Sequence, residues 1–227
     1  MMFKILPTLL TSCLMVAAVF ADEVNIPADR DTTLIEDAEG DAANGSGPGF
    51  FAGHTNQAEY GTRRGLIHFD VAAALPGNAI IDRVSLRLYQ NSSNSEPGVI
   101  SVHRVLSDWG EGKSSRSGGR GAPAEADDAT WLYTFYDQRN WAHPGGHFVP
   151  DASAAEVVKD RSFHTWKSTD KLVDDVRLWR HEPQQNFGWL LMGDEETRGS
   201  VKRFASRESK ESRQHPMLRI EYHLPGE

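Results

Sequence analysis

The sequence predicts an all-β protein, a jelly-roll-type antiparallel β-sandwich with one short helix. Apolar and polar residues alternate at period two along 84–89 and again along 217–224, which is typical of strands with one buried face. An apolar run at 66–69 precedes the first of these, and the Pro-Gly-Asn sequence at 76–78 between them predicts a turn. A strand, a turn and a second strand in this order predict the middle of an antiparallel sheet.

Further strands are expected around this central pair. A first strand falls within 22–36, and Pro27 excludes a central position in a sheet for its start. A short second strand begins at residue 50, after a loop of small residues. Later strands are predicted at 99–106, 162–166, 186–192, 201–206 and 217–224.

One stretch has helical rather than strand periodicity. Over 171–180, apolar residues recur on one face at helical spacing. Ser168 or Thr169 can cap the start of this helix, and Pro183 ends it.

Residues 22–227 are expected to form a single domain. The segment 110–128 has five glycines and almost no bulky apolar residue, so it predicts a long surface loop within that domain. A domain boundary at this segment is disfavoured, because each flanking piece is too small to form a sandwich alone. An all-β domain of this length is common.

Residues 1–21 have the pattern of a secretory signal peptide. Lys4 is followed by an apolar run, and small residues precede Asp22 as a cleavage site would require. We therefore expect a secreted, extracellular protein without membrane insertion. A lipoprotein is the alternative, because residues 10–13 fit a lipobox that ends at Cys13.

Cysteine content and charge argue against a disulfide-stabilised protein and against a nucleic-acid-binding protein. Cys13 is the only cysteine in the chain, so disulfides are excluded and the fold must depend on its core. The formal net charge of −8 argues against a nucleic-acid partner, which would favour a basic surface. A local basic groove on an acidic protein remains compatible with an anionic polysaccharide.

A series of motifs extends over nearly the whole predicted domain. They are GLIHFDV, LPGNAIIDRVSLRLY, VHRVLSDWGEG, DATW, PGG after Trp141, GWLL, RFASRE and MLRIEY, between residues 65 and 222. In order and number they resemble DNRLRE domains, which are also grouped with disaggregatase-related repeats and with carbohydrate-binding module family 96. The resemblance implies an extracellular jelly-roll sandwich that binds polysaccharide, most often alginate, and it implies no catalytic set.

Aromatic and arginine side chains are the candidate ligand-binding groups. Flat aromatic rings can stack on sugar faces, and guanidinium groups bind carboxylates through two hydrogen bonds. The alternatives are a core role for the aromatic residues and surface ion pairs for the arginines. The candidates are Trp109, Trp131, Tyr133, Trp141, Arg63, Arg64, Arg87, Arg203 and Arg207.

A structural calcium ion is the one cofactor that the sequence suggests. Secreted sandwiches often bind calcium through carboxylate and carbonyl oxygens of loops, although no EF-hand spacing is present. A zinc site at His143 and His147 is disfavoured, because the Pro-Gly-Gly sequence between them excludes a helix. The candidate calcium ligands are Asp29, Asp31, Asp194 and Glu195.

The function expected from the sequence is non-catalytic binding of an extracellular polysaccharide, with an anionic polymer such as alginate as one candidate. A polysaccharide lyase or hydrolase on the same scaffold is the first alternative, and a matrix or adhesion protein is the second. No nucleophile elbow, P-loop or dinucleotide motif is present. A lyase would need a base such as His54, His68, Tyr89 or His103.

Overall fold

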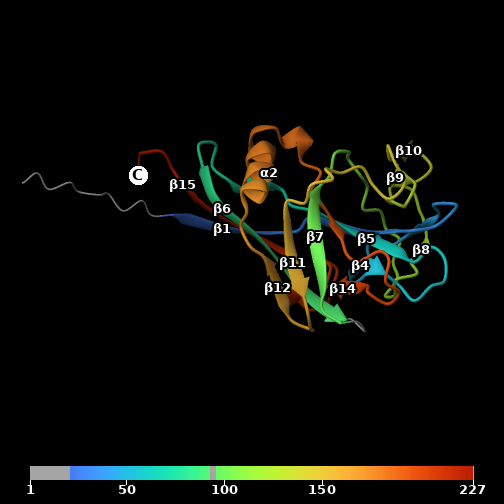
Figure 1. The fold of residues 1–227 in the computed structure, drawn as a ribbon. Helices are drawn as coiled ribbons and strands as arrows, with labels where there is room; N and C mark the ends of the chain where they lie inside the picture. Colours follow the sequence, from blue (N-terminus) through green and yellow to red (C-terminus); the bar gives the residue numbers. More distant parts are fainter. Residues whose placement is uncertain (1–20, 93–95, 227) are drawn as a thin grey trace, which may run out of the picture.

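The computed structural model describes residues 21–92 and 96–226. The expected signal peptide, apart from Ala21, lies outside the described residues, and so does Cys13. Among the described residues, no helix is both long and apolar enough to cross a membrane. The fold is an antiparallel all-β sandwich built from one large curled sheet, as the sequence predicts (Figure 1).

The first layer of the sandwich contains four antiparallel strands. Their order is β1 (Asp22–Pro27), β15 (Met217–His223), β6 (Ile80–Ser92) and β12 (Phe163–Trp166). β6 is the longest strand, and it pairs with β15 along one edge and with β12 along the other. The strand expected within 22–36 is interrupted after Pro27, so β1 joins the first layer and the next strand joins the second.

The second layer faces the first across the core. Its strands are β11 (Ala154–Val158), β7 (Gly98–Arg104), β13 (Trp189–Met192), β5 (Thr62–His68) and β2 (Arg30–Ile35). Two further strands, β4 (Phe50–His54) and β14 (Lys202–Phe204), pair with each other and connect β5 to the far end of β6. The layers are therefore parts of one continuous sheet.

The main core lies between the layers and is closed by a helix. Val84, Leu86 and Leu88 of β6 are fully buried against apolar side chains of the second layer. The helix α2 (Asp170–His181) packs Trp179 against Trp189 of β13, with ring centroids 4.4 Å apart. This helix confirms the one predicted at 171–180, and its start is capped by the Thr169 hydroxyl.

Several short elements were not predicted from the sequence. Asp70 caps a single helical turn, α1 (Val71–Ala74), that follows β5 directly. The others are 3₁₀ turns or two- to three-residue strands, namely β3 (Ala42–Ala43), β8 (Ala122–Pro123), β9 (Tyr133–Phe135), β10 (Arg139–Asn140), η1 (Pro183–Gln185) and η2 (Ser212–Gln214).

A second apolar cluster covers the outer face of the second layer. Leu34, Leu66 and Leu190 point outward from β2, β5 and β13, and they pack against the insertion formed by residues 106–150. The insertion contributes Trp109 and Trp141 to this cluster. The insertion therefore covers the outer face of β2, β5 and β13, whereas Val99 of β7 and Val157 of β11 remain exposed on the outer face of the same layer.

Candidate functional site

The outer face of the first layer is formed by the side chains that alternate with the core residues of its strands. On β6 these are Arg83, Ser85, Arg87 and Tyr89, because the intervening Val84, Leu86 and Leu88 are buried. The same alternation turns Arg219 and Glu221 of β15 outward.

The strand register arranges these side chains in cross-strand rows. In one row, Arg87 lies opposite Met217 on β15 and Thr165 on β12. In the next row, Ser85 lies opposite Arg219, which in turn lies opposite Asn25 on β1. Neighbouring strands are about 4.8 Å apart, so the residues of one row are in contact range.

Two adjoining hollows form a shallow trough across these rows. A cavity of about 400 Å³ is lined by Ser85, Arg87, Thr165, Arg219 and residues of β1. A second cavity, of about 260 Å³, shares three of these residues and adds Lys167 on its rim. We call this surface the sheet trough, and it is lined mainly by polar and charged side chains.

The sheet trough is locally basic although the whole chain carries a formal charge of −8. Arg219 pairs with Glu23 at 2.7 Å and with Glu221 at 3.1 Å. Arg87 and Lys167 form no ion pair with any carboxylate in the part of the chain that the structure describes. The trough thus offers a guanidinium and an ammonium group to an anionic ligand.

An exposed aromatic ring lies at one end of the trough. Phe163 of β12 is 42% exposed, and its ring centroid is 5.0 Å from that of Tyr89 in an edge-on arrangement. The guanidinium carbon of Arg87 lies 4.6 Å from the centre of the Phe163 ring. The guanidinium therefore lies over one face of the ring, and the cation and the apolar ring are presented together, as an acidic sugar would require.

The arginine pair at the start of β5 has a structural role instead. Arg63 is 1% exposed, and it donates to three backbone carbonyls and to the side chain of Gln57. Arg64 donates to Glu195 and stacks over Trp131 at 5.0 Å. Both guanidinium groups are held by neighbouring groups of the protein, so this pair serves the fold.

The predicted tryptophans belong to the second apolar cluster. Trp109 is fully buried, and its indole nitrogen donates to the backbone oxygen of Phe187 at 2.9 Å. Trp141 is also buried and donates to the backbone oxygen of Thr130 at 2.9 Å. Tyr133 is half-buried on β9, a strand of the insertion that lies at the right of Figure 1 and does not line the sheet trough. Both tryptophans therefore have a core role, which was the alternative to ligand binding.

The two late arginines lie near β14 and are engaged with neighbouring groups. Arg203 donates to the side-chain oxygen of Asn91 at 2.6 Å, and burial lowers the pKa of its guanidinium. Arg207 is bound by the carboxylates of Glu111 and Glu208. Of the five predicted arginines, Arg87 alone lies in the sheet trough.

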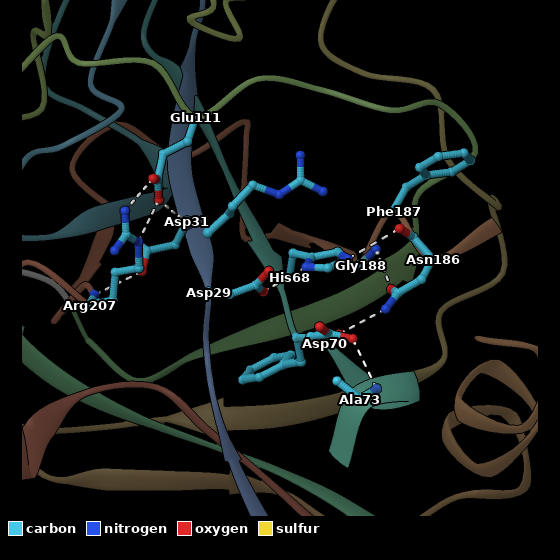
Figure 2. A network of polar contacts seen from close by, with 12 residues as sticks. Asp29, Asp31, His68, Asp70, Ala73, Glu111, Asn186, Phe187, Gly188 and Arg207 are labelled. Atoms are coloured by element: carbon cyan, nitrogen blue, oxygen red, sulfur yellow. Dashed lines mark hydrogen bonds and ion pairs between the residues drawn. The ribbon is translucent and has the colours of Figure 1, made fainter. Parts of the chain in front are cut away.

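Two of the candidate metal ligands belong to the polar network in Figure 2. Asp29 contacts His68, with 2.6 Å between Oδ1 and Nδ1, and the other ring nitrogen of His68 lies 3.2 Å from the carbonyl oxygen of Asn186. Burial raises the pKa of Asp29, but the hydrogen bond and charge of His68 outweigh it, so that the pKa is lowered overall. Both ring nitrogens of His68 thus lie within hydrogen-bonding distance of oxygen atoms.

Asp31 lies in a second part of the same network, close to Glu111 and Glu208, the two carboxylates that bind the guanidinium of Arg207. Its carboxylate accepts the backbone N–H of Arg207 at 2.8 Å, and its own N–H donates to Glu111 at 2.8 Å (Figure 2). Burial, and next the charge of Glu208, raise the pKa of Asp31 well above its usual value. Burial and the charge of Glu111 also raise the pKa of Glu208.

The other two candidate metal ligands serve the turn after β13. Asp194 accepts backbone hydrogen bonds from Glu196 and Thr197, both at 2.9 Å, and these bonds lower its pKa. Glu195 is held by Arg64. Within residues 21–92 and 96–226, no three His, Cys, Asp or Glu side chains converge in a way that could hold a metal ion.

Three residues of the sheet trough were not among those predicted from the sequence, namely Phe163, Lys167 and Arg219. Arg219 could have been found, because it interrupts the apolar residues Leu218 and Ile220 in an alternating strand and must point away from the core. Its position beside Ser85 depends on strand pairing, which periodicity does not give.

No protein-family model matches the chain, and no curated protein matches it either. The fold and the geometry of the sheet trough therefore carry the functional argument.

Proposed function

We propose that this chain is a secreted, non-catalytic carbohydrate-binding protein that holds an acidic extracellular polysaccharide in the sheet trough. The observation that carries the proposal is Arg87, an exposed cation without an ion-pair partner among the described residues, beside the exposed ring of Phe163. A uronate sugar offers a carboxylate for the first group and an apolar ring face for the second.

The shape of the sheet trough supports a polymer rather than a small molecule. The trough lies open on the face of a sheet, and its two hollows adjoin through Ser85, Thr165 and Arg219. Small-molecule sites are usually enclosed and mostly apolar. An extended chain lying across the strands would contact both hollows together.

Retention on immobilised alginate tests the proposal. We expect wild-type protein to be retained at low salt and released as ionic strength rises, because the contacts are between exposed charges. Arg87→Ala should weaken binding about tenfold, the loss expected for one charged hydrogen-bonding partner. Arg139→Ala is the matched control, because Arg139 is an exposed arginine on β10, at the other end of the molecule (Figure 1).

Two results would contradict the proposal. One is the absence of retention on alginate and on other carboxylated or sulfated polysaccharides. The other is equal weakening by Arg87→Ala and Arg139→Ala, which would mean that net charge rather than the sheet trough determines binding.

A lyase is the second candidate, and the position of Tyr89 on the same face favours it. Its ring contacts Phe163 beside Arg87, so a phenol and a carboxylate-binding guanidinium share one end of the trough. A lyase would release unsaturated sugar ends, which absorb ultraviolet light. Absorbance that rises with wild-type protein and stays flat with Tyr89→Phe would establish this activity in place of simple binding.

A further inference from the structure

A second basic surface lies at the tip of the insertion. Residues 113–121 contain Lys113, Arg116 and Arg120 and no acidic residue. All three cationic side chains belong to exposed residues, and none forms an ion pair within the described part of the chain. On an acidic protein, such a segment is a local concentration of positive charge. We call residues 113–121 the basic tip.

The basic tip is held in place by buried partners. The hydroxyl of Ser114 donates to the buried carboxylate of Asp128 at 3.0 Å. The backbone N–H of Arg116 donates to the side-chain oxygen of buried Asn44 at 2.8 Å. The backbone of the tip is therefore fixed at both of these points, and the guanidinium of Arg116 also donates to the carbonyl of Gly121 at 3.3 Å, so the loop is preorganised. A preorganised loop loses less conformational entropy on binding than a free one.

Arg63 contacts the backbone of the basic tip. Its guanidinium donates to the backbone oxygen of Gly119, and also to the carbonyl of Thr62 at 2.6 Å. Burial lowers the pKa of Arg63 to about 10, so the group keeps its charge at neutral pH. The buried arginine thus holds the backbone of the tip through a hydrogen bond and adds a positive charge next to it.

A hollow of about 280 Å³ adjoins the tip. Its walls are Thr55, Asn56, Gln57, Gly119 and Arg120. Hydroxyl and amide groups next to a guanidinium can bind both the hydroxyls and the acidic groups of a sugar. The chemistry of this surface therefore matches that of the sheet trough without sharing any residue with it.

The two surfaces share no residue and lie apart. β8, which follows the basic tip directly, is at the right of Figure 1, whereas β1, β6, β12 and β15 of the sheet trough are in its left and central parts. We propose that the basic tip binds a second acidic glycan chain, so that one protein molecule bridges two polymer chains. The class of ligand rests on the proposed function of the sheet trough, whereas the second contact rests on the tip itself.

Bridging is measured by loading the full protein onto alginate-coated beads and adding soluble fluorescent alginate. A protein with two separate sites captures the soluble polymer, whereas a protein with one site only coats the beads. The triple variant Lys113→Gln, Arg116→Gln, Arg120→Gln should remain bound to the beads through the sheet trough. Its capture of soluble alginate should fall at least about fivefold. Arg139→Gln, another exposed arginine of the insertion, should leave capture unchanged.

The possible outcomes separate the two proposals. Wild-type protein that binds the beads but captures no polymer, or a triple variant that captures as well as wild type, would overturn bridging and leave the sheet trough intact. A triple variant that no longer binds the beads while Arg87→Ala still does would assign binding to the tip alone and overturn the two-site arrangement. Wild-type protein that binds neither form of alginate would overturn both proposals.

Discussion

Arg64 and Glu195 are 131 residues apart in the sequence and form a two-pronged ion pair, with Nε–Oε1 at 2.7 Å and Nη2–Oε2 at 2.9 Å. The remaining nitrogen of Arg64 donates to the carbonyl of Gly145 at 2.8 Å. One side chain therefore joins β5, the turn after β13 and the insertion. Arg64, which was predicted to bind ligand, and Glu195, which was predicted to bind metal, therefore form an ion pair with each other.

Replacement of Arg64 should affect stability rather than binding. We expect Arg64→Ala to lower the free energy of unfolding by about 2 kcal/mol, because it leaves Glu195 partly buried without its partner. Urea denaturation of Arg64→Ala and of the exposed control Arg139→Ala measures the difference. Unchanged stability together with lost retention on alginate would return Arg64 to the ligand-binding residues.

The second apolar cluster should depend on Trp109. Trp109→Ala removes a fully buried indole that packs between the insertion and β2, and should destabilise the protein by about 3–5 kcal/mol. Tyr133→Ala, on the half-buried surface of the same insertion, should cost about 1 kcal/mol or less. Equal losses in thermal unfolding would show that the insertion does not depend on its buried tryptophan.

The carboxylate cluster around Arg207 should make the protein less stable as pH rises. Burial raises the pKa of Asp31 above that of the unfolded chain, so above about pH 4 the folded state holds a proton that the unfolded state has released. Asp31→Asn keeps the acceptor for the Arg207 N–H and removes this proton. We expect the variant to be more stable than wild type at neutral pH, with a flatter pH profile in denaturant titrations.

The contact between Asp29 and His68 should make the protein less stable as the pH falls. The lowered pKa of Asp29 means that its contribution is present above its unfolded pKa and is lost as the pH falls through the folded value. Asp29→Asn should therefore lessen acid destabilisation below about pH 4 and cost less than about 1 kcal/mol at pH 5, because Asp29 is partly exposed. A variant with an unchanged acid transition would contradict this.

Much of the fold was predictable because period-two patterns are local. The strand predicted at 84–89 lies within β6, those at 99–106 and 217–224 overlap β7 and β15, and α2 covers the predicted helix. The division of the first expected strand into β1 and β2 was not predicted. Pro27 marks where the division occurs, but the assignment of each half to a different layer depends on pairing with β15 and β5.

The site was less predictable because exposure is a property of packing. Residue type alone does not separate Arg63, whose donors are satisfied by carbonyl groups, from Arg87, which is open to solvent. The composition of 110–128 gave no indication that Ser114, Asp128 and the neighbouring Ala129 would be buried against other parts of the chain. Their partners come from segments distant in sequence, such as Asn44 and Gly45.

The pairing of β1 with β15 has a consequence for the order of assembly. β1 hydrogen-bonds with no strand other than β15 among the described elements, and β15 is made about 190 residues later. During synthesis, Val24 and Ile26 cannot be buried against Leu218 and Ile220 until β15 has been made. A chain that is still being synthesised therefore stays incompletely folded until β15 emerges from the ribosome.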